Sequence, residues 1–528
     1  KDLYQPTNVP PNIDVQPQPP VEKTEKIEPG LLSTPGNTDA FAQPQQIQQP
    51  QRGPFEKKTD VNIVPPDIAP LYRASQTNVQ VLDIDEPDML KHDGKNIYYS
   101  NKYPVKIISS FPPSNLSKIG AIDKSGNLLL YKNLLVIIEN SKLIYGFDVS
   151  KPSSPIEKWK IMLTENTHVS EARLYNGKIY LVTQTDINTA YPCPIPLTYG
   201  QSKLIIPCTQ IYHPKIYTPS DVTYTTMSIN IQTGVIENKV TFVGSNELSN
   251  IYMSSNALYI TYQVTSAFPD EHKQSLQKTG IVKIDLLKFS ITSVGEIPGK
   301  LLNQFSLDEY QGNLRIATTL ERDVFGSLES TNEVYVLDSN LEIIGSVKKL
   351  GLTERIYSVR FMGDKAYVVT FKEIDPFYII DLSDPRNPTQ KGELKIPGFS
   401  SYLHPIDGSR MLGIGREGTQ VKVTLFDISS PANPLELDTY KLNDYSSEIL
   451  ENHHAFLHDQ KHSVFFIPAG NSGYIFSYQG NQLYLVRSIS EIHARRALFL
   501  NDYMYILGED KIVVLDESSW QQVNQLEF

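Results

Sequence analysis

The sequence predicts an all-β protein that folds as a β-propeller of four-stranded antiparallel blades, and three observations support this class. Short apolar strands bounded by turn residues fill the chain from about residue 78 onward, with no sustained helical period. A strand–turn–strand unit recurs at steps of mostly roughly 40 to 55 residues. A second unit, a strand that ends in Asp before a turn, follows the hairpins. Repeats of this length with four strands each are typical of propellers.

The hairpin unit is clearest in ARLYNGKIYLVTQ (172–184) and VRFMGDKAYVVTF (359–371). Turn pairs such as Asn-Gly and Gly-Asp supply the residues with positive φ that two-residue hairpins need. The turns that we assign lie at Gly94, Asn133, Gly177, Asn256, Gly312, Gly363, Gly408, Lys461 and Asp502. We therefore predict nine blades. Eight blades is the alternative, because the unit around Lys461 is the least regular.

The strand that ends in Asp continues into similar turns at three places, DVSKPSSP (148–155), DLSDPRNP (381–388) and DISSPANP (427–434). Here Asp and Ser cap a turn, and the prolines end the strand because they cannot donate to its ladder. A last strand then completes each blade. The step from Gly177 to Asn256 is longer than the others, so we predict an insertion at about 186–222.

Residues 1–77 differ from the rest of the chain. Of the 36 prolines, 14 fall in residues 1–70, and the Pro/Gln-rich stretch AQPQQIQQPQRGP contains no aromatic residue. Such a segment buries too little apolar surface to offset the entropy that is lost on ordering. We expect an extended, polyproline-II-like tail or stalk, followed by a propeller that spans residues 78–528.

The charge and the start of the sequence bear on location. A formal net charge of −11 argues against a nucleic-acid-binding protein and against docking on anionic lipid, which both need a basic surface. No run of about 18 apolar residues is present, so we expect no membrane span in this chain. The chain begins at Lys1, as in an exported protein whose signal or anchor segment is absent, although a trimmed sequence would look the same.

The two cysteines, Cys193 and Cys208, both lie in the insertion, and each follows a proline. Two thiols alone in one loop predict a disulfide formed in an oxidising compartment. Closing a loop of about 15 residues contributes roughly 3 kcal/mol in the chain-entropy model. The alternative is a pair of free thiols. A zinc site would need two more ligands, and of the nearby residues only His213 is suitable.

Four long stretches support a resemblance to a known family: DIDEPDMLKHDGKNIYY (83–99), PGKLLNQFSLDEYQGNLRIATT (298–319), residues 354–417 and LFDISSPANP (425–434). In these stretches the chain resembles the secreted archaeal and bacterial proteins that carry a C-terminal β-propeller distantly related to WD40 repeats. The resemblance covers roughly residues 78–528 and is best in the second half. It implies an exported propeller at the cell surface, and it supplies no catalytic residues.

Asp83, Asp85 and Asp88 are candidate metal ligands, because alternating carboxylates can hold Ca²⁺ through hard oxygen atoms. The spacing lacks the glycine and the distant glutamate of an EF-hand loop. The alternative is therefore a capped, solvated turn that leads into the first blade. Apart from calcium at this place, we expect no cofactor.

Four histidines, His453, His454, His458 and His462, fall within ten residues and suggest a metal site. On a strand, however, neighbours such as His453 and His454 point to opposite faces of the sheet. We therefore expect these residues to be strand and turn histidines rather than metal ligands.

The stretch EIPGKLLNQFSLDEYQGNLRIATTL (296–320) contains Gln304 and the adjacent carboxylates Asp308 and Glu309, which alone would suggest a catalytic pair. In line with the other hairpins, the two carboxylates fall on an inner strand, where adjacent side chains face opposite ways. We therefore predict a boundary between two blades. Because an inner strand also lines the channel, Gln304 and Asp308 stay candidates for binding a ligand there.

Other candidate surface sites are Tyr402 and His404 in GFSSYLHP, the tyrosines of the insertion such as Tyr191 and Tyr199, and Asn115 in the glycosylation sequon NLS. We interpret the protein as a non-enzymatic extracellular or cell-surface scaffold. Its partners would be other surface proteins or copies of itself, joined through residues 1–77, as in a filament or layer. The alternative is an extracellular polysaccharide hydrolase or lyase with paired carboxylates at the channel mouth.

Overall fold

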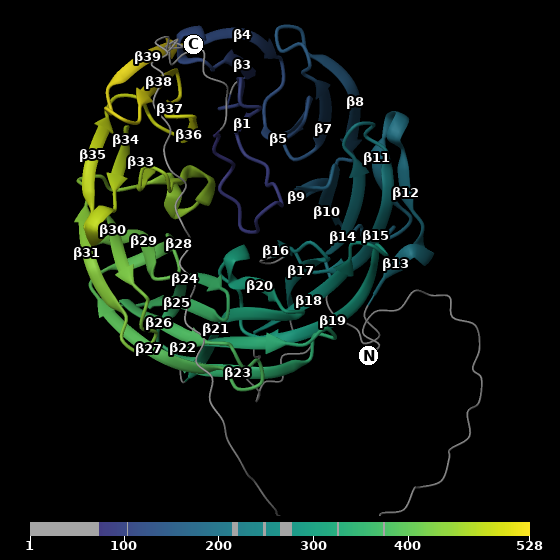
Figure 1. Ribbon diagram of the computed structural model, residues 1–528. Coiled ribbons are helices and arrows are strands. Elements are labelled where there is room, and N and C mark those ends of the chain that lie inside the picture. The colour runs from purple at the N-terminus through teal and green to yellow at the C-terminus, as the bar shows by residue number, and fades with distance from the viewer. Residues whose placement is uncertain are drawn as a thin grey trace, which may run out of the picture. The chain divides into compact units, whose positions relative to one another are not determined.

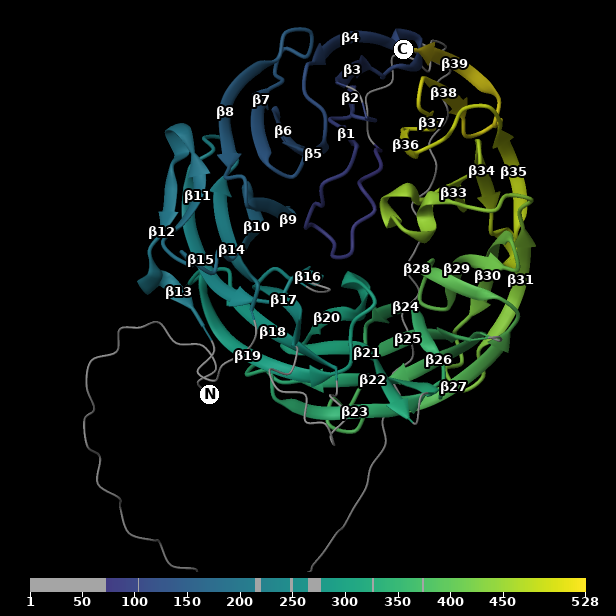
Figure 2. The same ribbon diagram turned by 180° about the vertical axis from the view of Figure 1, so that it is seen from behind.

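The computed structural model describes residues 73–102, 104–213, 220–246, 250–264, 277–324, 327–372 and 375–528. These residues form nine sheets placed one after another around a common centre (Figure 1), and Figure 2 shows the same ring from behind. The predicted all-β propeller is confirmed, with nine blades rather than eight. Residues 1–72, most of the predicted tail, lie outside the described residues.

Each blade contains four antiparallel strands, and their order along the chain runs from the innermost strand to the outermost (Figure 1). Blade 1 contains β1 (Leu90–His92), β2 (Asn96–Tyr99), β3 (Val105–Ser109) and β4 (Ser117–Ile122). Blade 2 contains β5 (Asn127–Tyr131), β6 (Leu134–Glu139), β7 (Leu143–Asp148) and β8 (Ile156–Leu163). Blade 3 contains β9 (Thr167–Tyr175), β10 (Lys178–Asp186), β14 (Val222–Asn230) and β15 (Ile236–Gly244). Blade 4 contains β16 (Asn250–Met253), β17 (Ala257–Val264), β18 (Lys278–Asp285) and β19 (Ser290–Pro298). Blade 5 contains β20 (Leu307–Tyr310), β21 (Asn313–Val324), β22 (Ser327–Leu337) and β23 (Ile343–Leu350). Blade 6 contains β24 (Arg355–Met362), β25 (Lys365–Phe371), β26 (Asp375–Asp381) and β27 (Thr389–Ile396). Blade 7 contains β28 (Phe399–Pro405), β29 (Arg410–Glu417), β30 (Gln420–Asp427) and β31 (Leu435–Lys441). Blade 8 contains β32 (Leu457–Asp459), β33 (Val464–Ala469), β34 (Ser472–Ser477) and β35 (Tyr484–Ile489). Blade 9 contains β36 (Arg496–Leu500), β37 (Tyr503–Leu507), β38 (Lys511–Asp516) and β39 (Gln522–Glu527).

Helical structure in the described ranges is confined to short 3-10 helices: η2 (Pro113–Asn115), η3 (Gly200–Ser202), η4 (Cys208–Gln210), η5 (Gln304–Ser306), η6 (Glu448–Leu450), η7 (His453–Ala455) and η8 (Gln479–Asn481). None of the helices in this part of the chain is long and apolar enough to cross a membrane. Asn115, the candidate glycosylation site, is exposed at the end of η2.

Each predicted hairpin turn lies between the first and second strands of a blade. The φ angles of Asn176 and Gly177 are 49° and 73°, and those of Gln311 and Gly312 are 51° and 81°. Two consecutive residues with positive φ are what a tight type I′ turn requires, and glycine adopts this region without steric cost. The turn residues therefore set the positions of these hairpins.

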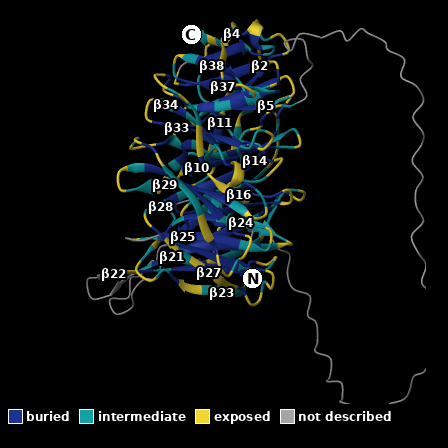
Figure 3. Ribbon diagram, turned by 60° about the vertical axis from the view of Figure 1, so that its left-hand side comes forward, coloured by how far each residue is buried: buried dark blue, intermediate teal, exposed yellow. Residues whose placement is uncertain are grey.

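The apolar core is divided among nine clusters, one between each pair of neighbouring blades. The cluster between the last blade and the first joins Leu498 and Tyr505 to Ile97 and Tyr99. The hydroxyl of Tyr99 also donates to the carbonyl of Gly508 at 2.9 Å. Figure 3 shows buried residues along the strands and exposed residues in the loops. Side-chain packing between the last and the first blade thus closes the ring.

The predicted Asp turns join the third and fourth strands. The carboxylates of Asp381 and Asp427 accept the backbone N–H groups of Ser383 and Ser429 at 2.9 and 2.8 Å. The prolines of such a turn pack on the outer strand of the preceding blade. A Cβ atom at Gly392 would collide with the carbonyl oxygen of Pro431, so this contact requires glycine. The repeated turn therefore also positions one blade against the next.

The chain between β10 and β14 carries three short strands: β11 (Ile195–Tyr199), β12 (Leu204–Ile206) and β13 (Ile211–Tyr212). β11 and β12 extend the outer edge of blade 2, whereas β13 pairs in parallel with β15 of blade 3. Cys193 and Cys208 form a disulfide in the structure, with their Cα atoms 5.3 Å apart. The insertion therefore bridges the rims of two blades.

Candidate functional site

The middle of the ring contains a part of the chain itself, residues 73–89, which we call the central segment (Figure 1). Its backbone forms bridges with the innermost strands of three blades: Ala74 with Leu500, Asp85 with Leu174, and Asp88 with Leu128. The central segment begins before residue 78, where the sequence suggested that the propeller starts. Because it contacts blades on different sides of the ring, protein rather than open space fills much of the centre.

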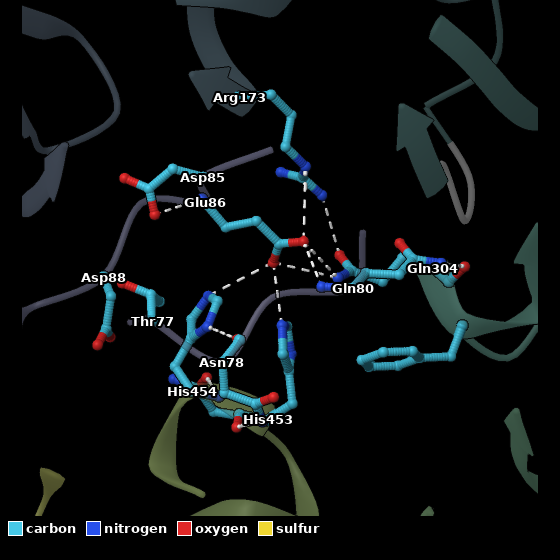
Figure 4. A network of polar contacts seen from close by, with 12 residues as sticks. Thr77, Asn78, Gln80, Asp85, Glu86, Asp88, Arg173, Gln304, His453 and His454 are labelled. Atoms are coloured by element: carbon cyan, nitrogen blue, oxygen red, sulfur yellow. Dashed lines mark hydrogen bonds and ion pairs between the residues drawn. The ribbon is translucent and has the colours of Figure 1, made fainter. Parts of the chain in front are cut away.

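Glu86 of the central segment is the focus of a polar network, which Figure 4 shows from close by. Its side chain is only 4% exposed. The carboxylate lies near polar side-chain and backbone groups from several elements: His453 Nε2 at 3.0 Å, His454 Nε2 at 3.6 Å, Gln304 Nε2 at 3.2 Å, the Gln80 N–H at 3.1 Å and Arg173 Nε at 3.8 Å. The network joins the central segment to blades 3, 5 and 8.

The electrostatics of this network favour a charged Glu86. Burial opposes ionisation, but Arg173 and the hydrogen bond from His453 outweigh it and hold the pKa of Glu86 well below its usual range. Burial likewise disfavours the charge on Arg173, but Glu86 and Glu171 raise the pKa of Arg173. Burial, with the neighbouring His453, lowers the pKa of His454 to about 4. The network is thus built around a buried ion pair.

The structure contradicts the predicted strand at His453 and His454. These residues lie in the 3-10 helix η7, and the side chain of Asn452 accepts the N–H of His454 at 3.0 Å as its N-cap. The rings therefore do not point to opposite faces; their centroids are 4.1 Å apart, and both face Glu86. An asparagine directly before the two histidines is a helix-capping signal that could have predicted this turn.

In the described part of the chain, two groups of His, Cys, Asp and Glu side chains have ligand atoms within 4.8 Å of one another: Glu86, His453 and His454, and Asp459, His462 and Glu517. The second group already binds the guanidinium of Arg73, at 2.6 Å from Asp459 and 2.5 Å from Glu517. The first group has no such cation between its ligand atoms. It is therefore the better candidate for holding a metal ion.

The candidate calcium ligands belong to neither group. Asp83 is exposed, Asp85 lies 2.6 Å from Lys91 Nζ, and Asp88 lies 2.7 Å from Arg496 Nη2. The three carboxylates are therefore directed to different surroundings rather than to a common ion.

Two of the predicted binding residues contact the central segment. The carbonyl of Gln304 accepts from Gln80 Nε2 at 2.7 Å, and the hydroxyl of Tyr402 accepts from Asn78 Nδ2 at 2.9 Å. His404 Nε2 instead lies 3.3 Å from His458 Nδ1, and burial holds the pKa of His404 well below its usual range. Tyr402 lies on the inner strand β28, but the predicted strand position of Gln304 is wrong, because Gln304 begins the 3-10 helix η5 before β20.

The adjacent carboxylates Asp308 and Glu309 do not share a site. Asp308 accepts from Arg315 Nε at 2.8 Å within its own sheet. Glu309 accepts from the hydroxyls of Ser254 and Tyr259 in blade 4 at 2.8 and 2.9 Å. Their interactions support the predicted boundary between two blades.

A cavity of about 290 Å³ lies beside the Glu86 network and is lined by Glu86, Arg173, Gln304, His453 and His454 among others. A second cavity of about 510 Å³ is lined by other residues of the central segment, together with Lys91, Leu457 and Arg496. The network can thus be reached from a cavity that could contain water or a small ligand. The arrangement can bind a cation or stabilise an anion. The carboxylates that line this cavity are those of Glu86, Glu171 and Glu451, and the first two lie against Arg173.

The nine blades and the filled centre define the class of this protein: a β-propeller whose own residues 73–89 occupy its channel. Comparison with known proteins agrees, and the chain belongs to the Beta propeller domain family, which it matches over residues 74–520. It is 42% identical to an uncharacterized protein of Archaeoglobus fulgidus, with 86% of this chain and 85% of that protein covered. It is 36% identical to the uncharacterized protein MJ1554 of Methanocaldococcus jannaschii, with 86% and 84% covered. Among solved structures, a eukaryotic initiation factor is similar with a TM-score of 0.47 and 11% identity, covering 82% of this chain and 95% of that one.

Proposed function

We propose that the protein is a non-enzymatic scaffold that binds other proteins, including copies of itself, through its rim. The observation that carries this proposal is the occupied centre of the ring. The central segment bonds to blades 2, 3 and 9 through its backbone, and its buried Glu86 contacts Gln80, Gln304 and His453. Binding to a partner must therefore use the faces or the rim of the propeller.

The insertion is the part of the rim best suited to a partner. Tyr191 and Tyr199 are 81% and 50% exposed although both are large aromatic residues. They line a cavity of about 300 Å³ together with Pro192, Pro194 and Pro196. Tyrosine supplies much contact area with little loss of side-chain entropy, and the disulfide holds this loop in place.

The partner that we propose for this surface is the Pro/Gln-rich segment of another copy. Grooves lined by aromatic residues recognise extended proline-rich segments, whose preformed conformation lowers the entropy lost on binding. The chain itself carries 14 prolines in residues 1–70. A propeller that bears both the segment and the surface for it can join its copies head to tail.

Sedimentation of the full-length protein tests this proposal. We expect association that grows with protein concentration and that is reversed by an excess of a peptide with the sequence of residues 40–54. Replacing Tyr191 and Tyr199 together by Ala should weaken association about tenfold, since a central aromatic contact commonly contributes more than 1 kcal/mol. Tyr445→Ala is the matched control, because Tyr445 is 73% exposed outside the insertion.

A protein that stays monomeric at every soluble concentration would contradict the proposal. So would equal association of the Tyr191→Ala/Tyr199→Ala variant and the wild type, provided that both have the same far-UV circular dichroism.

We place this scaffold outside the cell membrane. The disulfide in the insertion supports this location, because disulfides persist mainly in oxidising compartments. The net charge of −11 fits a soluble exposed surface. A reagent that labels lysines but does not cross membranes should label the protein on intact cells. Labelling only after the cells are broken would contradict an external location.

The alternative, a polysaccharide hydrolase or lyase, has less support. It needs an accessible carboxylic acid with a raised pKa close to a second carboxylate. Burial raises the pKa of both Asp85 and Glu517. However, Asp85 is paired with Lys91, and the Glu517 side chain is fully buried against Arg73. Both are better explained as groups that hold the central segment.

A further inference from the structure

We propose that Glu86, His453 and His454 form a binding site for a divalent transition-metal ion, with zinc as the expected ion. The site would hold the central segment to blade 8, and the inference does not depend on the proposed scaffold function. Two imidazoles and one carboxylate are a ligand set that binds zinc through three protein atoms.

The spacing of the ligand atoms fits this ion. Glu86 Oε2 lies 3.0 Å from His453 Nε2 and 3.6 Å from His454 Nε2. Ligands about 2.0–2.1 Å from a tetrahedral zinc ion are separated by about 3.3 Å. The observed distances fall on either side of this value, so small rotations of the side chains would suffice to bring the three atoms into the coordination sphere.

The proton on His454 provides an independent argument. His454 Nδ1 lies 2.8 Å from the carbonyl oxygen of Asn78, which can only accept a hydrogen bond. Nδ1 therefore carries a proton, and Nε2 is the ring nitrogen that faces the Glu86 carboxylate. Nε2 and Glu86 Oε2 lie 3.6 Å apart, and both atoms can donate an electron pair to a metal ion. A zinc ion would satisfy both.

The surroundings of the three ligands resemble those of known metal sites. An imidazole that binds a metal commonly donates its other N–H to a carbonyl, as His454 does to Asn78. Arg173 lies 3.8 Å from Oε1, whereas Oε2 faces the two histidines and accepts from Gln304 Nε2 at 3.2 Å, which a second lone pair of Oε2 leaves compatible with an ion. The charge of Arg173 should weaken binding without blocking it.

The fourth coordination position is expected to face the cavity of about 290 Å³, since all three ligands line it. A water molecule would complete a tetrahedral site there. Nitrogen ligands favour zinc, cobalt or nickel over calcium and magnesium, which prefer oxygen. The site thus differs in chemistry from the calcium site suggested by the aspartates.

Titration of the full-length protein with Zn²⁺ and with Co²⁺, after dialysis against a chelator, tests the inference. We expect one zinc ion bound per chain by calorimetry, and a cobalt absorption spectrum with the visible bands of four-coordinate Co²⁺ bound to nitrogen. The variants Glu86→Gln and His454→Gln should each bind zinc at least about 100-fold more weakly. His168→Gln is the control, since His168 is a half-buried inner-strand histidine whose ring bonds Gln184.

Zinc should also raise the midpoint of thermal unfolding of the wild type and of His168→Gln, but not that of Glu86→Gln, since an ion that binds only the folded state stabilises it. Absence of zinc binding and of cobalt bands in the wild type would overturn the inference. So would unchanged zinc affinity in both Glu86→Gln and His454→Gln. The wild-type spectrum decides the matter even where a variant fails to fold.

Discussion

Replacing Arg496 by Met is expected to lower the free energy of unfolding by about 3–5 kcal/mol, because it leaves a buried carboxylate without its counter-ion. Arg496 begins the inner strand of blade 9, and its side chain is 2% exposed. Nη2 donates to Asp88 at 2.7 Å, and Nη1 donates to Glu448 at 2.8 Å. One guanidinium thus joins the last blade to the central segment and to blade 8.

The electrostatics of Asp88 explain the size of this effect. Burial alone would raise the pKa of Asp88, but the charge of Arg496 outweighs it and lowers the pKa to about 2. Without Arg496, the Asp88 carboxylate would stay charged or bind a proton at a cost in free energy. Because Asp88 also bridges to Leu128, the loss should loosen the central segment.

Urea unfolding of matched variants checks this prediction. Arg386→Met is the control, since Arg386 is exposed and its loss should change the free energy of unfolding by less than about 0.5 kcal/mol. Adding Asp88→Asn to Arg496→Met removes the unpaired charge and should restore at least about 1 kcal/mol. A double variant no more stable than Arg496→Met would contradict the explanation by an unpaired charge.

The blades could be predicted from the sequence because their signals are local. A turn such as Asn176-Gly177 fixes the backbone of its own hairpin, and an Asp such as Asp427 caps a turn within two residues. Each signal recurs in most blades, so one weak copy, around Lys461, did not change the count. The nine apolar clusters then follow, since the strands have no other surface to pack against.

The filled centre could not be predicted, because its contacts are not local. Asp85 bridges to Leu174, and Ala74 bridges to Leu500 at the far end of the chain. Nothing in the DIDEPD motif indicates such partners, and its carboxylates are equally expected in a solvated turn. Glu86 is buried in the structure, and a buried carboxylate must find cations and donors, but its burial is not visible in the sequence.

The histidines show a different limit. The strand period, which is correct for most of the chain, placed His453 and His454 on opposite faces, but Asn452 starts a turn of 3-10 helix there. A local capping signal overrides the alternating pattern where a connection between two blades replaces a strand. The candidate metal site therefore depends on the residues that depart from the repeat.

The free energy of unfolding of the wild type is expected to fall as the pH rises from about 5 to about 8, and the Glu517→Gln variant is expected to lack this fall. The Glu517 side chain is fully buried and lies 2.5 Å from Arg73 Nη2. Burial raises the pKa of Glu517 to about 8 from its ordinary value of 4.5, and the charge of Asp459 adds to the rise although Arg73 opposes it. Asp459 and Glu517 therefore compete for one guanidinium at the start of the central segment.

The sign of the effect follows from the direction of the shift. A carboxyl whose pKa is higher in the folded state binds its proton more tightly there than in the unfolded chain. The stabilisation of the folded state by the bound proton is complete below pH 4.5, the ordinary pKa of the group, and it is lost as the pH rises through about 8. The loss has an upper limit of about 1.4 kcal/mol per pH unit. Glutamine carries no charge at any pH, so the variant should lack this slope.

The difference in the free energy of unfolding between wild type and Glu517→Gln, measured in urea across this pH range, isolates the group. His462 Nε2 lies 3.1 Å from Asp502 and 3.6 Å from Glu517, and both neighbours of Glu517 are present in each protein. Glu527→Gln is the matched control, because Glu527 is exposed on β39 of the same blade. If the difference for Glu517→Gln stayed constant with pH, Glu517 would be charged in the folded protein. Arg73 would then hold two carboxylates rather than one carboxylate and one carboxylic acid.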